Sequence, residues 1–157
     1  MLDDFAMRDL ILAIAHHALI FALAGVLAFE IGVARQGLSA NDVRRLGKVD
    51  AWYGILAGLI LAVGFVRAVF AAKGWAYYET NTFFWAKIGT FALVGILSIW
   101  PTIAFIRWRR ALASDPSTLP APAAVTTVRR FLWAEILFFA LIPAFAAAMA
   151  RGYGAPG

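Results

Sequence analysis

Cysteine is absent from this chain of 157 residues, and histidine occurs only as the adjacent pair His16 and His17. Without thiols the chain can form no disulfide, thiolate metal centre, iron–sulfur cluster or covalent c-type haem. Because both imidazoles would lie on one helix, a b-type haem held between histidines of two helices of one molecule is also excluded. Charge is scarce as well, since charged residues make up 15% of the chain and hydrophobic residues 63%.

What the chain does contain is four long apolar runs, at about 10–29, 51–72, 83–105 and 131–150. Each is about 20 residues long, the length with which an α-helix crosses a hydrocarbon core of about 30 Å. In lipid the backbone polar groups must be satisfied within each segment, so the runs are predicted to be helices. We therefore expect an all-α integral membrane four-helix bundle, formed by residues 1–157 as a single domain.

Lysine and arginine are concentrated in two of the connections between these runs. They are Arg35, Arg44, Arg45, Lys48, Arg107, Arg109, Arg110, Arg129 and Arg130. By the positive-inside rule the first and third connections should be cytoplasmic, with both termini on the outer, periplasmic side. The net charge of +5 is explained by this topology and predicts no nucleic-acid partner. The expected location is a bacterial inner membrane, which the chain crosses several times.

The segments between the spans carry local signals. Residues 39–42, Ser-Ala-Asn-Asp, are expected to cap a short amphipathic turn. The connection at 73–82 reads as an aromatic loop at the membrane interface, and the one at 111–127 as an irregular loop. Pro101 and Pro143 are expected to bend the third and fourth helices. Gly54 and Gly58 form a small-residue pair that permits close helix packing.

Ionisable residues inside a bilayer are costly and usually face the interior of a bundle. On the predicted outer side, His16, Arg67 and Lys87 lie about 9, 7 and 6 Å from the ends of their spans, from a rise of 1.5 Å per residue. Because these depths match, three helices can present the three groups to one pocket. Two cations and an imidazole favour an anion site, or contacts to the propionates and iron of a haem. The alternatives are that the cations reach the headgroups and that the histidines only bond between helices.

The two histidines point about 100° apart on a helix, so only one is expected to face the bundle. His16 lies one heptad after Asp9 and two heptads before Glu30, on one stripe of the helix. His16 is therefore the candidate iron ligand if Glu30 faces inward, and His17 replaces it if the helix is rotated by one residue. Trp85 and Phe84 are expected to add aromatic walls to this pocket. No catalytic residue can be assigned.

On the predicted inner side, Glu30, Asp50 and Glu135 lie near the ends of three different spans. The cations that lie close to them in sequence or in depth are Arg35, Lys48, Arg107 and Arg129. The simpler hypothesis is a layer of ion pairs that locks the helices together. The alternative is a proton pathway or a cation site, because carboxyl groups at hydrophobic depth can exchange protons.

Several runs resemble a family of four-span bacterial membrane proteins that carries the label of a domain of unknown function. The runs lie at 47–54 (GKVDAWYG), 73–78 (KGWAYY), 81–87 (NTFFWAK) and 98–102 (SIWPT). The resemblance covers nearly the whole chain. It implies the same four-span architecture and supplies no activity.

The chain is more distantly similar to the four-helix membrane family of protoporphyrinogen oxidases. That family uses a histidine in the first helix and a lysine early in the third, where this chain has His16 or His17 and Lys87. The resemblance implies haem b or a porphyrin as cofactor, His16 as the iron ligand, and an oxidoreductase acting on a porphyrinogen.

Three hypotheses of function therefore stay open. The first is a non-enzymatic membrane protein, either an accessory subunit of a larger complex or homo-oligomer, or a lipid-binding bundle. The second is a membrane redox protein that binds haem or a porphyrin. The third is a small proton-coupled transporter that uses Glu30, Asp50 and Glu135.

Overall fold

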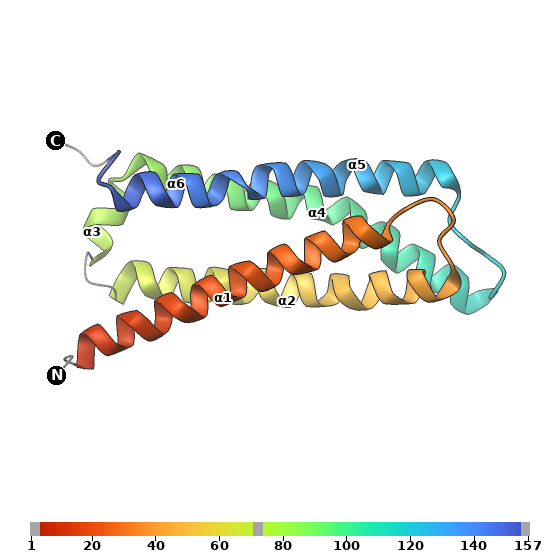
Figure 1. The fold of residues 1–157 in the computed structure, drawn as a ribbon, viewed down its shortest axis with the longest axis horizontal. Helices are drawn as coiled ribbons and strands as arrows, with labels where there is room; N and C mark the ends of the chain where they lie inside the picture. The colour runs from red at the N-terminus through yellow and green to blue at the C-terminus, as the bar shows by residue number, and fades with distance from the viewer. Residues whose placement is uncertain (1–3, 71–73, 155–157) are drawn as a thin grey trace.

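The computed structural model describes residues 4–70 and 74–154, and four helical rods dominate it (Figure 1). The first two rods are α1 (Asp4–Val33) and α2 (Ala40–Phe70), and a short helix α3 (Gly74–Glu79) follows. The third rod is α4 (Thr82–Ser114), and α5 (Pro122–Phe139) and α6 (Leu141–Ala150) together form the fourth. The expected all-helical fold is confirmed, with four helical stretches long and apolar enough to span a membrane. Residues 71–73, where the second span was expected to end, lie outside the described residues.

The four rods run side by side, so the connections fall at two opposite ends (Figure 1). The chain termini and α3 lie at one end, which we call the termini end. The connections at 34–39 and 115–121 lie at the other, which we call the basic end because of its arginines. The sequence predicted this pairing of the first and third connections.

At the basic end, α2 begins well before its apolar run because its first turn is capped. The Ser39 hydroxyl accepts a bond from Asp42 N at 3.2 Å, and Asp42 Oδ2 accepts from Ser39 N at 3.0 Å. This reciprocal pair satisfies two backbone donors that a helix start would leave free. The expected cap is present, and the turn that it starts continues into α2 without a break.

The other two connections contain more helix than the sequence predicted. The loop expected at 111–127 covers only 115–121 in the structure, because α4 continues to Ser114 and α5 begins at Pro122. The fixed φ of proline suits the first turn of a helix. Within this loop Asp115 accepts hydrogen bonds from Ser117 N, Ser117 Oγ and Thr118 Oγ1, which lower the pKa of its carboxyl group. The aromatic loop expected at 73–82 contains the helix α3.

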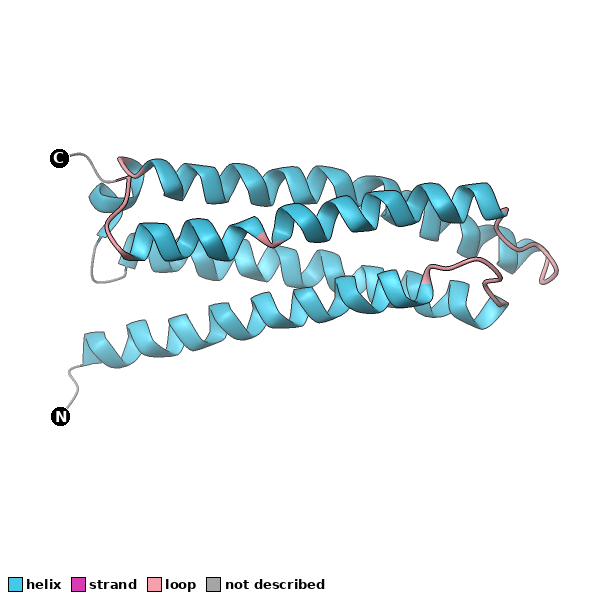
Figure 2. Cartoon of the chain, turned by 45° about the horizontal axis from the view of Figure 1, so that its top comes forward, coloured by secondary structure: helices cyan, strands magenta, loops and turns pink. Residues whose placement is uncertain are grey.

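The two prolines act differently on their helices. Pro143 has no N–H to offer the carbonyl of Phe139, and the fourth rod is interrupted at Ala140, between α5 and α6 (Figure 2). Pro101 is buried inside α4, which continues through it. The sequence therefore predicted the site of the interruption in the fourth rod correctly, and the third helix remains one element.

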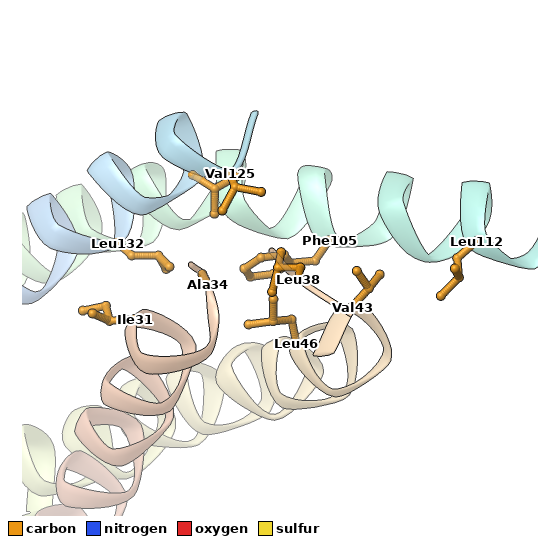
Figure 3. Packing of buried hydrophobic residues seen from close by; sticks show 10 residues of the cluster. Ile31, Ala34, Leu38, Val43, Leu46, Phe105, Leu112, Val125 and Leu132 are labelled. Carbon is orange, nitrogen blue, oxygen red and sulfur yellow. The ribbon is translucent and has the colours of Figure 1, made fainter. Parts of the chain in front are cut away.

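Two apolar clusters fill the bundle at different levels. The cluster nearest the basic end centres on Leu46, Phe105 and Leu132, which are all fully buried (Figure 3). The second cluster lies further toward the termini end and centres on Leu23, Leu27 and Val94. The Gly54–Gly58 pair belongs to neither, since a Cβ at either glycine would meet nothing within 4 Å.

Helix α1 leaves the bundle as it approaches the termini end. It packs on α2 and α5, but among the described residues no backbone contact joins it to α6. Figures 1 and 2 both show the N-terminal half of α1 lying apart from α6. The bundle is therefore closed at the basic end and open on one side at the termini end.

Candidate functional site

A cavity of about 700 Å³ occupies the termini end, where α1 separates from α6. His16 of α1, Arg67 of α2 and Lys87 of α4 all line it. The structure thus brings together the three groups whose matching depths the sequence indicated. Side chains of α3 and α6 complete the wall, and most of these are apolar or aromatic.

A second, apolar chamber of about 270 Å³ adjoins this termini-end cavity. His16 and Lys87 line both chambers and so lie at their junction, where the other shared residues are Ile20, Gly64, Phe84 and Ile142. Arg67 lines only the larger chamber. The combined space therefore has a cationic part and an apolar part, as an amphipathic ligand requires.

His16 and His17 have different environments. The His16 ring is half-buried and packs against Gly64, where a Cβ would lie 3.0 Å from His16 Cε1. His16 Nδ1 is buried and has no hydrogen-bond partner within the part of the chain that the structure describes. His17 also lines the larger cavity, but it is exposed and donates from Nδ1 to Ala13 O at 2.7 Å. Glu30 is buried, as the heptad stripe through His16 requires, so His16 is the histidine that faces the bundle.

The two cations of the cavity are not neutralised by acids. Arg67 Nε is buried without a hydrogen-bond partner, and Lys87 Nζ lies 5.2 Å from the centroid of the Phe84 ring. In the described ranges no carboxylate oxygen lies within 4 Å of either side chain's nitrogens. Positive charge at this depth is costly unless an anion or water compensates it. The cavity is therefore chemically suited to an anionic group.

Trp85 does not take the place that the sequence assigned to it. Its side chain is 51% exposed, and its Nε1 donates to Glu79 O at 2.8 Å instead of facing the cavity. One residue is a rotation of about 100° on a helix, and this rotation points the neighbouring Phe84 inward and Trp85 outward. Phe84, which was expected in this wall, lines the cavity together with Tyr77 and Tyr78.

Asn81 is a structural residue of this end that the sequence reasoning missed. Its side chain is fully buried, and Oδ1 accepts bonds from Phe83 N and Phe84 N, which caps α4. Its Nδ2 donates to Tyr153 O at 3.1 Å, and Thr82 N donates to Gly154 O at 3.1 Å. The C-terminal segment is thereby fastened to the start of α4. The signal was an asparagine directly before an apolar run, the pattern of an N-cap.

A second polar group, which we call the carboxyl cluster, lies deeper in the bundle and consists of Glu30, Asp50 and Glu135. Their side chains come from α1, α2 and α5 and are 2%, 9% and 1% exposed. Glu30 lies close enough to both other acids to interact with them electrostatically. The three acids that the sequence grouped by depth therefore do meet.

The ion pairs expected for this cluster are absent from the described residues. No lysine or arginine nitrogen lies within 4 Å of the three carboxyl groups there, and Arg35 and Arg107 are exposed. Arg129 instead donates to the carbonyls of Ile31 and Ala34, at 2.9 and 3.0 Å. The expected layer of ion pairs is therefore wrong for these acids. The backbone carbonyls at the end of α1 have no partner within the helix, and they accept the hydrogen bonds of Arg129, which was expected to pair with the acids.

Neutral hydroxyl groups surround the acids. Thr102 Oγ1 donates to Asp50 Oδ1 at 2.7 Å, and the Tyr53 hydroxyl lies beside Glu135 and Ser98. Glu30 Oε1 and Glu135 Oε1 are buried without a partner in the described part of the chain. Nothing in those residues groups three or more side chains as a metal site would require.

Comparison with protein families places the chain in a known family of membrane proteins. The family model described as "Predicted membrane protein (DUF2214)" matches residues 8–154, nearly the whole chain. No curated protein and no solved structure matches the chain significantly. The match brings no haem or oxidase assignment with it. With four helical stretches that can span a membrane and this family match over most of its length, the chain belongs to the DUF2214 family of membrane proteins.

Proposed function

We propose that this protein is a non-enzymatic, lipid-binding membrane protein whose termini-end cavity holds an anionic amphipath, with an acidic phospholipid as the first candidate. One observation carries the proposal. Arg67 and Lys87 line an otherwise largely apolar cavity at membrane depth, and no described carboxylate pairs with them. A phosphate headgroup would supply the missing negative charge through charge-assisted hydrogen bonds.

The dimensions of the cavity agree with this ligand class. Its volume of about 700 Å³ lies in the range of about 300–1,000 Å³ typical of small-molecule sites. The adjoining apolar chamber, bounded by Ile60, Phe91 and Phe139, can receive part of an acyl chain. A soluble anion would gain nothing from that second chamber, so the pair of chambers favours an amphipath.

The opening between α1 and α6 supports supply from the bilayer. A molecule that diffuses in the membrane can pass between these helices, since no backbone contact joins them in the described residues. The arginines of the basic end favour the cytoplasm for that end. We infer that the cavity faces the outer leaflet of a bacterial inner membrane.

The test is the lipid that the purified protein retains, identified by native mass spectrometry after exchange into mixed vesicles of anionic and zwitterionic phospholipids. We expect a preference for the anionic lipid that falls about tenfold or more in Lys87→Met and in Arg67→Gln, because each loses a charged hydrogen bond of about 1.5–3 kcal/mol. Arg151→Gln is the matched control, since it removes an exposed cation at the same end outside the cavity. Equal retention of both lipids by the wild type would refute the proposal.

Haem or a porphyrin is the second candidate, favoured by the unpartnered Nδ1 of His16 beside the two cations. An imidazole could bind the iron while Arg67 and Lys87 hold the propionates. The purified protein should then show a Soret band that His16→Ala abolishes and His17→Ala leaves in place. A colourless protein that also takes up no added haemin would reject this candidate and leave the lipid.

A further inference from the structure

We propose that the carboxyl cluster is a proton-binding site inside the membrane, separate from the termini-end cavity, and that its acids exchange protons with the solvent. Glu30 and Glu135 are the proton-holding groups, and Asp50 completes the site. The proposal does not depend on the lipid-binding function.

The position of the cluster separates it from water. Glu30 and Glu135 are at least 98% buried, from α1 and α5, and apolar clusters lie on both sides of them along the bundle. The basic-end side is closed by the cluster around Phe105, and the termini-end side by the cluster around Val94. Solvent cannot compensate an ionised carboxylate at such a site.

The groups that face the cluster supply no positive charge. From α2 these are Asp50 and Tyr53, and from α4 they are the hydroxyls of Ser98 and Thr102. Two cations of the packed helices are engaged elsewhere: Arg129 donates to the end of α1, and Arg109 donates to Gly47 O at 3.2 Å.

Without a compensating cation, the carboxyl cluster must bind protons to reduce its negative charge. Each uncompensated ion in a protein interior costs several kcal/mol even after relaxation, and three adjacent negative charges add mutual repulsion. The described residues offer no metal-like grouping that could bring in a cation instead. A proton is the remaining ligand that removes the charge without needing space.

The hydrogen bonds indicate where the protons reside. Asp50 already accepts a bond from Thr102, which suits its ionised form. Glu30 Oε1 and Glu135 Oε1 have no donor in the described residues, so an ionised form of either group would leave a buried oxygen without a hydrogen bond. The Tyr53 hydroxyl interacts with Glu135, and a hydroxyl can accept a hydrogen bond from a protonated carboxyl group as well as donate to an ionised one. Asp50 is also the least buried of the three acids and provides the contact through which protons are exchanged.

The experiment is infrared difference spectroscopy of the full chain in lipid nanodiscs, which detects the carbonyl stretch of protonated carboxyl groups. Glutamate labelled with ¹³C identifies the source, because the chain contains only Glu30, Glu79 and Glu135, and Glu79 is exposed. We expect a labelled protonated-carboxyl band at neutral pH that disappears reversibly at alkaline pH. Glu30→Gln and Glu135→Gln should each remove about half of it, whereas Glu79→Gln should leave it intact.

Three results would overturn the proposal. They are the absence of a labelled band at neutral pH, a band that survives both cluster substitutions, and a band that stays constant at alkaline pH while the protein remains folded. The labelling arm uses the unaltered sequence, so it decides the question even if a substituted protein fails to fold. Thermal unfolding gives a second readout. Replacing a protonated glutamic acid with glutamine should change the melting temperature little, whereas replacing an ionised and paired glutamate should lower the melting temperature clearly.

Discussion

Replacing Asn81 with alanine should destabilise the termini end more than any exposed substitution there. The side chain makes three hydrogen bonds, two that cap α4 and one that holds the carbonyl of Tyr153. Alanine removes all three and leaves the buried N–H of Phe84 without its side-chain acceptor. The start of α4 and the C-terminal segment should therefore loosen together.

The magnitude follows from the bonds lost. An N-cap asparagine is worth about 0.5–2 kcal/mol relative to alanine. The bond to Tyr153 O adds about 0.5–1.5 kcal/mol. A total of about 2 kcal/mol is expected, and at about 2–4 °C per kcal/mol for a chain of this size the melting temperature should fall by about 4–8 °C.

The assay is thermal unfolding in a fixed detergent or nanodisc, followed by tryptophan fluorescence. Asn41→Ala is the matched control, since Asn41 is exposed in the first turn of α2 and should change the melting temperature little. Asn81→Asp keeps the capping oxygen and loses only the donor to Tyr153, so it should fall between the two. If Asn81→Ala unfolds at the wild-type temperature, the cap and the C-terminal fastening do not stabilise the protein as argued.

Three further predictions follow. Gly64→Val should reduce occupancy of the cavity about tenfold or more, because a Cβ added there would lie 3.0 Å from His16 Cε1. Gly58→Val, where an added Cβ meets nothing within 4 Å, should bind as the wild type does in the lipid retention assay. The hydrogen bonds to Asp115 lower the pKa of its carboxyl group, so its ionised form stabilises the loop at every pH above the ordinary aspartate pKa of about 3.9. This stabilisation is lost as the pH falls through the lowered pKa. The ¹³C chemical shift of the carboxyl carbon measures the titration, and a titration at the ordinary pKa would contradict the prediction. Reporter insertions at 34–39 and at 115–121 should both give cytoplasmic signals, and opposite signals would refute the shared basic end.

Much of this architecture could be predicted because hydrophobic length in a bilayer leaves few alternatives. Four apolar runs gave four helical rods, and the matching depths of His16, Arg67 and Lys87 predicted their convergence on one cavity. The heptad from His16 to Glu30 favoured His16 as the inward histidine only if Glu30 faces inward, and the structure supplies that condition by burying Glu30. These inferences rest on rise and rotation along a helix, which tertiary packing changes little.

The errors concern choices between competing partners, which spacing along a helix cannot decide. Arg129 was near enough to the acids in depth to pair with them, but the carbonyls of Ile31 and Ala34 took its donors. Trp85 and Phe84 were equally plausible as a cavity wall until the rotation of α4 was known. Long polar side chains have several acceptors within reach, so their partners depend on packing details that a single sequence does not contain.

The two polar sites are insulated from each other, and this shapes what the protein can do. His16 and Glu30 belong to one stripe of α1 and lie 14 residues apart, about 21 Å along the helix. Between them the buried positions Leu23 and Leu27 are both fully apolar and pack against α2, α4 and α5. The apolar chamber extends from His16 toward Phe139, one turn after Glu135, but His16 and Lys87 are the only polar side chains among its described lining residues. An anion in the cavity and a proton on the carboxyl cluster are therefore separated by apolar surroundings, with no polar side chain of that chamber to relay a proton between them. Coupling between the sites would therefore have to pass through movement of the helices that contribute to both, α1 with His16 and Glu30 and α2 with Arg67 and Asp50. Of these two, α1 packs, among the described residues, against the fourth rod at α5 but not at α6, so its movement is the expected route.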